Sequence, residues 1–443
     1  MIKKSLFALS LLYSVGMSAE PWTLRDCIQH ALQNNIAIRK NIINEESDKA
    51  SLTQVKSTLW PSLSFSTTHG VSYRPGQESA IERPVDGEMV STSQTNVSST
   101  YGINMNWIVW NGGINHKNIE AQKVNNEINQ LTTETSQLSI QEQIVQYYVQ
   151  IMYTREAVKV NQSLVATAEA QYNRGVEFHK EGQMSKADLL QLEAQLASAR
   201  YDVVNSQSQM EDYKRQLKNL LQLDMNVDFD ITGNIPGDER VLEAIPTAKE
   251  VYEQALLTRP EIRSAEKSIE SADIQYNIAK RGYYPTIGLN AGISDSHNTN
   301  SSNSVGTQMK NNLNMNASVS LSIPIWDQRS TSTNKQKALL QKTTAQLELA
   351  DQKNILSSTV EQLWLNATTG QQRFLSAESK SRSQQASYEL VDEQFKNGLK
   401  SVVDVLQGRD NILSAEQDKL QSKYTTLLNI QLLKFYQGED LDL

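Results

Sequence analysis

The chain contains the same pattern of residues twice. An offset of 224 residues relates the two copies as far as Pro61 and Pro285, and an offset of 216 relates them from Trp110 and Trp326 onward. Neither stretch needs an insertion or deletion, so an eight-residue change falls between these two pairs. Fixed spacing over long stretches with one variable segment is typical of a repeated structural unit with a hairpin of variable length. The predicted bounds are 20–235 for repeat 1, 236–246 for a linker and 247–443 for repeat 2.

The first residues predict export. Lys3 and Lys4 precede an apolar run, which is followed by small residues before Glu20. This order is typical of a secretory signal peptide, which we place at residues 1–19. The run is too short for a membrane helix, and no long uninterrupted apolar stretch follows it. Any membrane crossing is therefore expected to use strands.

Composition argues against several classes of function. Without Lys3 and Lys4 the chain has 40 basic and 50 acidic side chains and no basic cluster, which argues against nucleic acid as a partner. The lone Cys27 lacks the pattern of a lipidated cysteine, and we expect a packed thiol in the first helix. The histidines show no metal-ligand spacing, and common catalytic motifs are missing. We therefore expect no metal, no cofactor and no enzymatic activity.

Four segments alternate apolar with small polar residues, and this period of two predicts strands. Each is about ten residues long, which is enough to cross a bilayer at a tilt with one face toward lipid and one toward water. The alternative is a half-buried sheet of a soluble protein. The predicted strands are 62–73, 100–110, 286–294 and 313–325. The polar segments 74–94 and 295–310 are expected to be exposed outer loops.

Aromatic residues favour the membrane interpretation, because they stand at the same end of all four predicted strands. Such an arrangement is typical of an interfacial girdle in contact with outer membrane lipid. The residues are Trp60, Trp107, Trp110, Tyr283, Tyr284 and Trp326.

Most of the remaining chain is predicted to form long antiparallel helical hairpins. No proline occurs at 112–222 or after 324, so each range can hold helices without interruption. A helix over about 113–178 would be roughly 100 Å long. The return helices carry seven-residue seams, such as the leucines at 406, 413, 420 and 427.

Four strands cannot close a barrel. An open sheet edge in hydrocarbon leaves backbone groups unpaired at a cost of several kcal/mol each. Two, three or four copies would give eight, twelve or sixteen strands, and the sequence pattern alone does not choose among them. Small residues on the polar faces favour a water-filled lumen.

Several motifs together resemble the TolC-like outer membrane efflux proteins, over nearly the whole mature chain. These motifs are the opening segment 22–35, the steps Trp60-Pro61 and Tyr284-Pro285, and Gly-x-x-Ser-x-x-Asp at 182–188 and 398–404. The resemblance implies a mainly helical fold with a membrane β-barrel. It implies a homotrimer whose shared twelve-stranded barrel continues into a periplasmic α-barrel. It also implies a passive outer membrane channel-tunnel, the exit duct of a tripartite efflux or type I secretion system, gated at its periplasmic tip. The implied partners are a periplasmic adaptor and an inner-membrane transporter.

Three of the four candidate gate residues, Asp188, Lys400 and Asp404, follow the two hairpin glycines. Asp188 and Asp404 would supply six carboxylates in a trimer, and such rings attract cations. The resemblance gives Asp404 an acidic ring position, Lys400 a position where arginine often stands, and Phe395 an aromatic one. Gln407 stands where a second acidic ring can occur. The alternative is that these charges are solvated and cap the return helices.

The two hairpin glycines are expected to have a structural role. Gly182 and Gly398 are expected to reverse the chain between long helices, because glycine tolerates a left-handed backbone. The resemblance adds that these glycines, with Ser185 and Ser401, form the surface where an adaptor docks.

Two other functions remain as alternatives. One is a structural coiled-coil envelope protein anchored by a β-barrel, and the other is an envelope hydrolase that uses paired carboxylates. The small polar strand faces favour a conduit over an anchor. The exported substrate, the pump, the resting state of the gate and the linker fold are not specified by the sequence.

Overall fold

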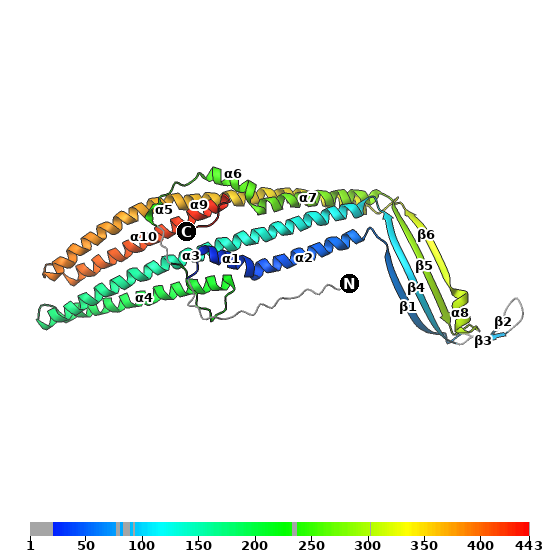
Figure 1. Ribbon diagram of the computed structural model, residues 1–443, viewed down its shortest axis with the longest axis horizontal. Coiled ribbons are helices and arrows are strands. Elements are labelled where there is room, and N and C mark those ends of the chain that lie inside the picture. The colour runs from blue at the N-terminus through cyan, green and yellow to red at the C-terminus, as the bar shows by residue number, and fades with distance from the viewer. Residues whose placement is uncertain are drawn as a thin grey trace. The chain divides into compact units, whose positions relative to one another are not determined.

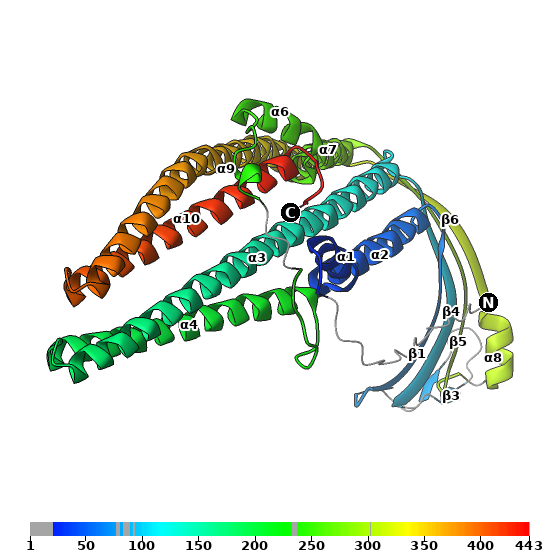
Figure 2. The ribbon, with the colours of Figure 1, turned by 60° about the vertical axis from the view of Figure 1, so that its left-hand side comes forward.

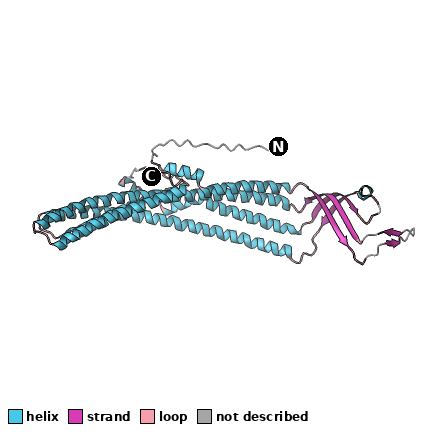
Figure 3. Ribbon diagram, turned by 90° about the horizontal axis from the view of Figure 1, so that it is seen from below, coloured by secondary structure: helices cyan, strands magenta, loops and turns pink. Residues whose placement is uncertain are grey.

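The computed structural model describes residues 21–76, 80–82, 89–91, 94–232, 237–301 and 303–442. The predicted signal peptide lies outside these residues. Most of the described chain is helical, and strands are confined to a few segments (Figure 3). The helices are α1 Leu24–Asn34, α2 Ile36–Ser57, α3 Ile114–Lys180, α4 Lys186–Leu221, α5 Asp238–Val241, α6 Ala248–Thr258, α7 Pro260–Lys280, the 3-10 turn η1 Arg281–Tyr283, α8 Val305–Asn312, α9 Ser330–Lys396 and α10 Val402–Tyr436. The strands are β1 Ser62–Tyr73, β2 Ala80–Glu82, β3 Met89–Ser91, β4 Thr95–Trp110, β5 Thr286–Asn298 and β6 Asn314–Ser322.

Helices of the two repeats have matching bounds. α1 and α6 are both 11 residues long and begin 224 residues apart. α3 and α9 are both 67 residues long and begin 216 residues apart. α1 and α6 also begin at equivalent residues. Thr23 before α1 and Thr247 before α6 each form a reciprocal capping box with an acidic residue three positions later. The sequence offsets are therefore also structural offsets.

The chain divides into two compact units, each with residues from both repeats. The helical unit comprises the residues up to Ile42 together with Thr132–Ile262 and Asp351–Leu443, and the sheet unit comprises Ile43–Leu131 and Arg263–Ala350. The core of the helical unit is formed mainly by side chains from α1, α3, α4 and α10, together with Ile38 of α2, Val241 of α5 and Phe374 of α9. Cys27 is completely buried in this core, as expected, and burial raises the pKa of its thiol to about 12.

The sheet unit contains an antiparallel sheet in the order β1-β4-β5-β6 (Figure 1). The four strands curve together (Figure 2). Ile103 of β4 lies opposite Phe65 of β1 and Ile293 of β5, so the apolar positions form one face and the Ser, Asn and Gly positions form the other. Within the described residues, β1 and β6 each have one strand neighbour, so both are open edges. The expectation of four strands in one sheet is confirmed.

The predicted outer loops contain more structure than expected. Segment 74–94 includes the short hairpin β2–β3, and segment 295–310 includes the end of β5 and most of α8. Ser304 caps α8, and the buried Gln308 bonds both the N–H and the C=O of Asn298. The loop prediction was wrong for α8 because this helix is held by polar side chains, which leave no apolar period in the sequence. The strand bounds also differ, since β4 begins at Thr95 and β6 ends at Ser322.

Candidate functional site

Both helical hairpins turn by the same backbone arrangement. Gly182 and Gly398 have left-handed φ values of 74° and 72°. After the first helix the N–H of Gln183 bonds the C=O of Phe178 at 2.8 Å, and after the second the N–H of Leu399 bonds the C=O of Gln394 at 2.9 Å. This is the Schellman arrangement, which favours glycine at the left-handed residue. The structural role expected for the two glycines is thereby explained, and their role in docking stays a prediction.

The repeated Ser and Asp of the motif cap the return helices. Ser185 Oγ accepts from the N–H of Asp188 at 3.1 Å, and Ser401 Oγ accepts from the N–H of Asp404 at 3.3 Å. At the second tip the carboxylate of Asp404 also accepts from the N–H of Ser401 at 3.0 Å, which completes a capping box. These bonds from Ser401, side chain before backbone, lower the pKa of Asp404. Capping is therefore sufficient to explain both aspartates, and the gate role stays a prediction.

The structure separates the other two candidate gate residues. Lys400 Nζ lies 3.7 Å from Asp404 Oδ1, and both side chains are about two-fifths exposed, so this pair contributes little to stability. Phe395 is buried and packs edge-to-face on Phe178 with ring centroids 6.3 Å apart. It belongs to a packed cluster with Val402 and Val405. Phe395 is thus a core residue within one chain, whereas Lys400 and Asp404 lie on the surface.

A buried polar contact between the two hairpins was not found by sequence reasoning. Gln171 of α3 donates to Tyr388 Oη at 2.5 Å and to Asp392 Oδ1 at 3.1 Å, both on α9. Asp392 in turn pairs with Lys396 at 2.9 Å. Burial, and then the nearby Asp392 carboxylate, raises the pKa of Tyr388 to about 12. Burial opposes ionisation of Asp392, but the bonds from Lys396 and Gln171 hold its pKa below the ordinary value.

The sequence signal for this contact is weak. Gln171 and Tyr388 stand at seam positions of long helices. The sequence pattern at such a position is the same whether or not the residue contacts another hairpin. Only the packing of α3 against α9 brings them together.

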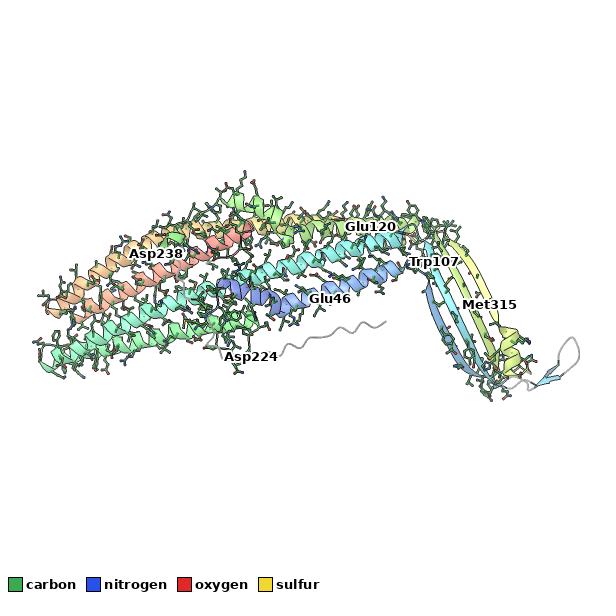
Figure 4. All side chains as sticks on the ribbon, viewed as in Figure 1. Glu46, Trp107, Glu120, Asp224, Asp238 and Met315 are labelled. Atoms are coloured by element: carbon green, nitrogen blue, oxygen red, sulfur yellow. The ribbon has the colours of Figure 1, made fainter. Side chains whose placement is uncertain are left out.

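The aromatic residues of the predicted girdle lie at the end of the sheet where the helices begin. Figure 4 labels Trp107 at this end and Met315 toward the other end of the sheet. Trp107 Nε1 donates to the C=O of Leu59 at 2.9 Å, and the rings of Trp110 and Tyr284 are 6.5 Å apart. Trp60 and Trp326 are 74% and 80% exposed. Tyr283 is also exposed, and contact of these residues with lipid stays a prediction.

The described residues contain no group of three or more His, Cys, Asp or Glu side chains arranged to hold a metal ion. None of the helices in the described ranges has the length and hydropathy needed to cross a membrane.

Comparison with known proteins supports the interpretation of the fold and of the two repeats. Residues 27–222 and 251–439 match the family described as outer membrane efflux protein. The chain belongs to this family. The predicted resemblance is therefore confirmed, as is the outer membrane location with a periplasmic helical part.

Individual proteins and solved structures are also similar to this chain. An uncharacterized protein of Haemophilus influenzae is 24% identical over 298 residues, which are 66% of this chain and 60% of that protein. The chain therefore matches less than two thirds of that relative. The outer membrane channel CmeC of Campylobacter jejuni is 20% identical with a TM-score of 0.75, covering 94% of this chain and 87% of that one. The outer membrane channel MtrE of Neisseria gonorrhoeae, in its open state, is 19% identical with a TM-score of 0.69, covering 94% and 88%.

At these identities the structural likeness shows the fold. The predicted fold class, long helical hairpins with four strands from each chain, is confirmed. The solved structures of CmeC and MtrE are described as outer membrane channels, and the predicted class of outer membrane efflux protein is confirmed for this chain at the level of the family.

Proposed function

We propose that three copies of this chain form a passive outer membrane duct that carries cargo out of the periplasm and has no catalytic activity of its own. The duct opens at its helical tip when a periplasmic adaptor and an inner-membrane transporter engage it. The transporter supplies the energy for export.

The sheet is the observation that carries this proposal. Its apolar face is exposed at Leu63, Met315 and Val319, which suits contact with lipid. Its other face consists of Ser, Thr, Asn and Gly over most of its length, which suits a water-filled lumen. Its two edges are open, and an edge in hydrocarbon needs a partner. Three copies supply twelve strands, within the range of known bacterial barrels.

Gating at the tip is supported by the polar contact between the hairpins. Gln171, Tyr388 and Asp392 are the groups that join α3 to α9 by hydrogen bonds in this region. A buried hydrogen bond to a carboxylate is worth more than a neutral one, and it can be broken without disturbing an apolar core. Such a contact suits a latch that holds the hairpins together in the closed state.

Single-channel conductance in a planar bilayer tests the duct and its gate. Wild type is expected to show a small conductance, and Asp392→Ala a larger one, because the variant removes the charged one of the two acceptors of Gln171. Asp418→Ala is the matched control, since its ion pair with Lys380 joins α9 to α10 of the same hairpin. The double variant Lys400→Ala with Asp404→Ala tests the predicted surface gate separately.

Each outcome has a distinct meaning. A rise for Asp392→Ala but not for Asp418→Ala supports a latch between hairpins. Equal conductance in all variants contradicts gating at these residues. No conductance from inserted trimers contradicts the duct and favours the structural coiled-coil alternative.

A further inference from the structure

The two helical hairpins have equivalent helices but differ in the groove between them. Between α9 and α10 of repeat 2 (Figure 2) there is a cavity of about 870 Å³. Its lining includes Arg373, Ser376 and Ala377 of α9 and Asp418, Gln421 and Ser422 of α10. This volume lies within the range of small-molecule sites, roughly 300–1,000 Å³.

Contacts between α9 and α10 define the shape of the groove. Gly370 lies in its floor, so close to α10 that a Cβ on it would be 2.3 Å from Thr426 Oγ1. Lys380 Nζ pairs with Asp418 Oδ2 at 2.7 Å and bridges one end. The lining residues of α9 run from Leu365 to Lys380, so the groove is roughly 20 Å long at the helical rise of 1.5 Å per residue.

Repeat 1 fills the equivalent groove. The offset of 216 relates Ala377 to Asn161, whose buried amide donates to Ser206 Oγ at 3.2 Å and thereby joins α3 to α4. Ser422, the counterpart of Ser206, lines the cavity of repeat 2. A smaller side chain in repeat 2 thus leaves open the space that an amide occupies in repeat 1.

The groove of repeat 2 also has cations that repeat 1 lacks. Arg373 and Lys380 correspond to Ala157 and Leu164. Asp418 balances the charge of Lys380, whereas the exposed guanidinium of Arg373 has no hydrogen bond or ion pair with another described residue. A guanidinium can donate two parallel hydrogen bonds to a carboxylate. The groove therefore offers one unpaired cation in a chain whose net charge is −8.

Apolar surface lies next to this cation. Ala377 lines the cavity one helical turn after Arg373, and Lys380 follows with its head group held by Asp418. The methylene stem of a lysine held in this way covers a neighbouring apolar group. The chemistry of the groove therefore matches a ligand that has an anionic group at one end and an apolar body at the other.

The cavity faces away from the linker. Gln371 Nε2 donates to the last C=O of α5 at 2.9 Å, and Lys423 Nζ bonds Asp238 of α5 at 2.6 Å, so α5 lies against one side of this hairpin (Figure 1). Arg373 and Gln421 are each two positions away from these residues, which is about 200° around an α-helix. Linkers inside a duct would obstruct it, so the side with the cavity is the side that faces the passage.

We propose that this groove binds small molecules that have one carboxylate and an apolar body, on the wall of the passage. The carboxylate pairs with Arg373, and the apolar body fills the space next to Ala377. The position on the wall of the passage rests on the proposed function, whereas the binding site rests on the contacts of α9 and α10.

Protection of a thiol tests the site in full-length protein with Cys27→Ala. Ser376→Cys places a thiol in the groove, and the neutral reagent N-ethylmaleimide labels it. Naphthoate is the probe and is expected to slow this labelling. Naphthamide has nearly the same shape without the charge, and about tenfold more of it is expected to be needed for half protection. Val160→Cys, at the equivalent position of repeat 1, is the matched control and should not be protected.

Two variants separate the charge from the space. Arg373→Gln removes the cation and is expected to raise the half-protecting concentration of naphthoate about tenfold, while that of naphthamide stays the same. Ala377→Asn copies the filled groove of repeat 1 and is expected to abolish protection by both probes with Arg373 in place. Circular dichroism checks that both variants fold. Unchanged protection by naphthoate in either folded variant, or equal protection of Val160→Cys, would overturn the site.

Conductance in a planar bilayer tests the position of the site. Naphthoate is expected to reduce the conductance of wild type by a larger fraction than that of Arg373→Gln. Protection without any reduction of conductance would overturn the position on the wall of the passage. Absence of protection in protein that conducts normally would overturn the site and leave the duct intact. Protection that depends on Arg373 in inserted trimers without conductance would overturn the duct and leave the carboxylate site.

Discussion

The two repeats share a backbone and differ in the side chains that each position places against its neighbours. At the strand-to-helix turn, repeat 1 has glycines and repeat 2 has Gln328 and Arg329 in the same left-handed conformation. The two copies therefore keep the same backbone conformation at this turn. The side chains at the turn differ because they face different neighbours in each copy. Differences between the copies identify surfaces with different partners.

The break between the first two helices of each repeat shows the same effect inside the core. Asn35 is buried and its amide donates to the C=O of Leu220 at 2.9 Å. Its counterpart Arg259 is equally buried, pairs with Glu142 at 2.7 Å and lies 3.6 Å from the ring centroid of Tyr436. A neutral cap in one repeat thus corresponds to a buried ion pair in the other.

The two tips differ in the same way at the surface. The second tip exposes Leu399 and Val403, at 75% and 61%. The equivalent residues of the first tip are Gln183 and Ala187. Exposed apolar side chains beside a tight turn suit contact with a partner helix, so the second tip is the better candidate for adaptor docking.

Bulky substitution of the tip glycines gives the largest expected difference between the repeats. Gly398→Trp is expected to abolish efflux while trimers still form, because the surroundings of Gly398 are open and the indole would block a docking partner. Gly182→Trp is expected to have a smaller effect. Efflux is measured as growth with those dyes, detergents or metal ions to which deletion of the chain sensitises the host.

The matched control is Gly398→Ala, which shares the left-handed backbone cost of roughly 1 kcal/mol but adds little volume. It should retain most efflux. A fully active Gly398→Trp would contradict docking at this tip, and equal loss from both tryptophan variants would contradict the difference between tips.

The buried arginine gives the largest expected difference in stability. Arg259→Met leaves Glu142 without its cation and is expected to destabilise the protein by about 3–5 kcal/mol. Asn35→Ala removes one buried hydrogen bond and is expected to cost about 1–3 kcal/mol. Denaturant unfolding of the detergent-solubilised protein, followed by circular dichroism, measures both.

Removing the partner charge as well sharpens this test. Arg259→Met with Glu142→Gln should recover part of the loss, since no uncompensated carboxylate remains. Similar losses for Arg259→Met and Asn35→Ala would show that the ion pair adds nothing beyond a neutral cap.

The sequence predicted the fold better than the sites, for physical reasons. Alternation of apolar and polar residues has only one regular backbone solution, so the strands near Leu63 and Leu289 were predictable. A constant offset preserves helix length, and the observed bounds of α3 and α9 follow it. By contrast, α8 depends on the amide of Gln308, which has no periodic signature.

The tip residues could be predicted as a motif but not separated by role. Ser401 and Asp404 look the same in a sequence whether they cap a helix or line a pore. The resemblance gave Phe395 a gate position, which stays a prediction, and its burial against Phe178 became visible only in the packing. The contact of Gln171 with Asp392 joins two residues that are 221 positions apart in the sequence, which no local pattern reports.

Substitutions at the two strand-to-helix turns are expected to change stability by moderate amounts and in opposite directions. Gly112→Ala adds a Cβ at left-handed φ and 2.8 Å from Tyr284, and is expected to destabilise by about 1–3 kcal/mol. Gln328→Gly relieves the same backbone cost and is expected to stabilise by about 0.5–1 kcal/mol. Thermal unfolding of both variants beside wild type tests this, and destabilisation by Gln328→Gly would mean that its side chain has a packing role that outweighs the backbone cost.

The smallest expected effect is a difference between the helix caps of the two tips in how their stability depends on pH. Bonds from Ser401 lower the pKa of Asp404, so its stabilisation is fully present above the unfolded-state pKa of about 3.9. It is lost as the pH falls through the lower folded-state pKa. Asp404→Asn should therefore weaken protection of the α9–α10 tip at pH 6 and match wild type at low pH.

The first tip is the control for this prediction. In the described structure Ser185 caps α4 through the backbone N–H of Asp188, a bond that Asp188→Asn leaves in place. Amide hydrogen exchange of the two tip peptides, read by mass spectrometry between pH 3 and pH 6 with correction for intrinsic rates, should show a larger effect for Asp404→Asn. Equal effects at both tips would mean that general helix-dipole attraction, and not the complete capping box at Ser401, sets the contribution of these aspartates.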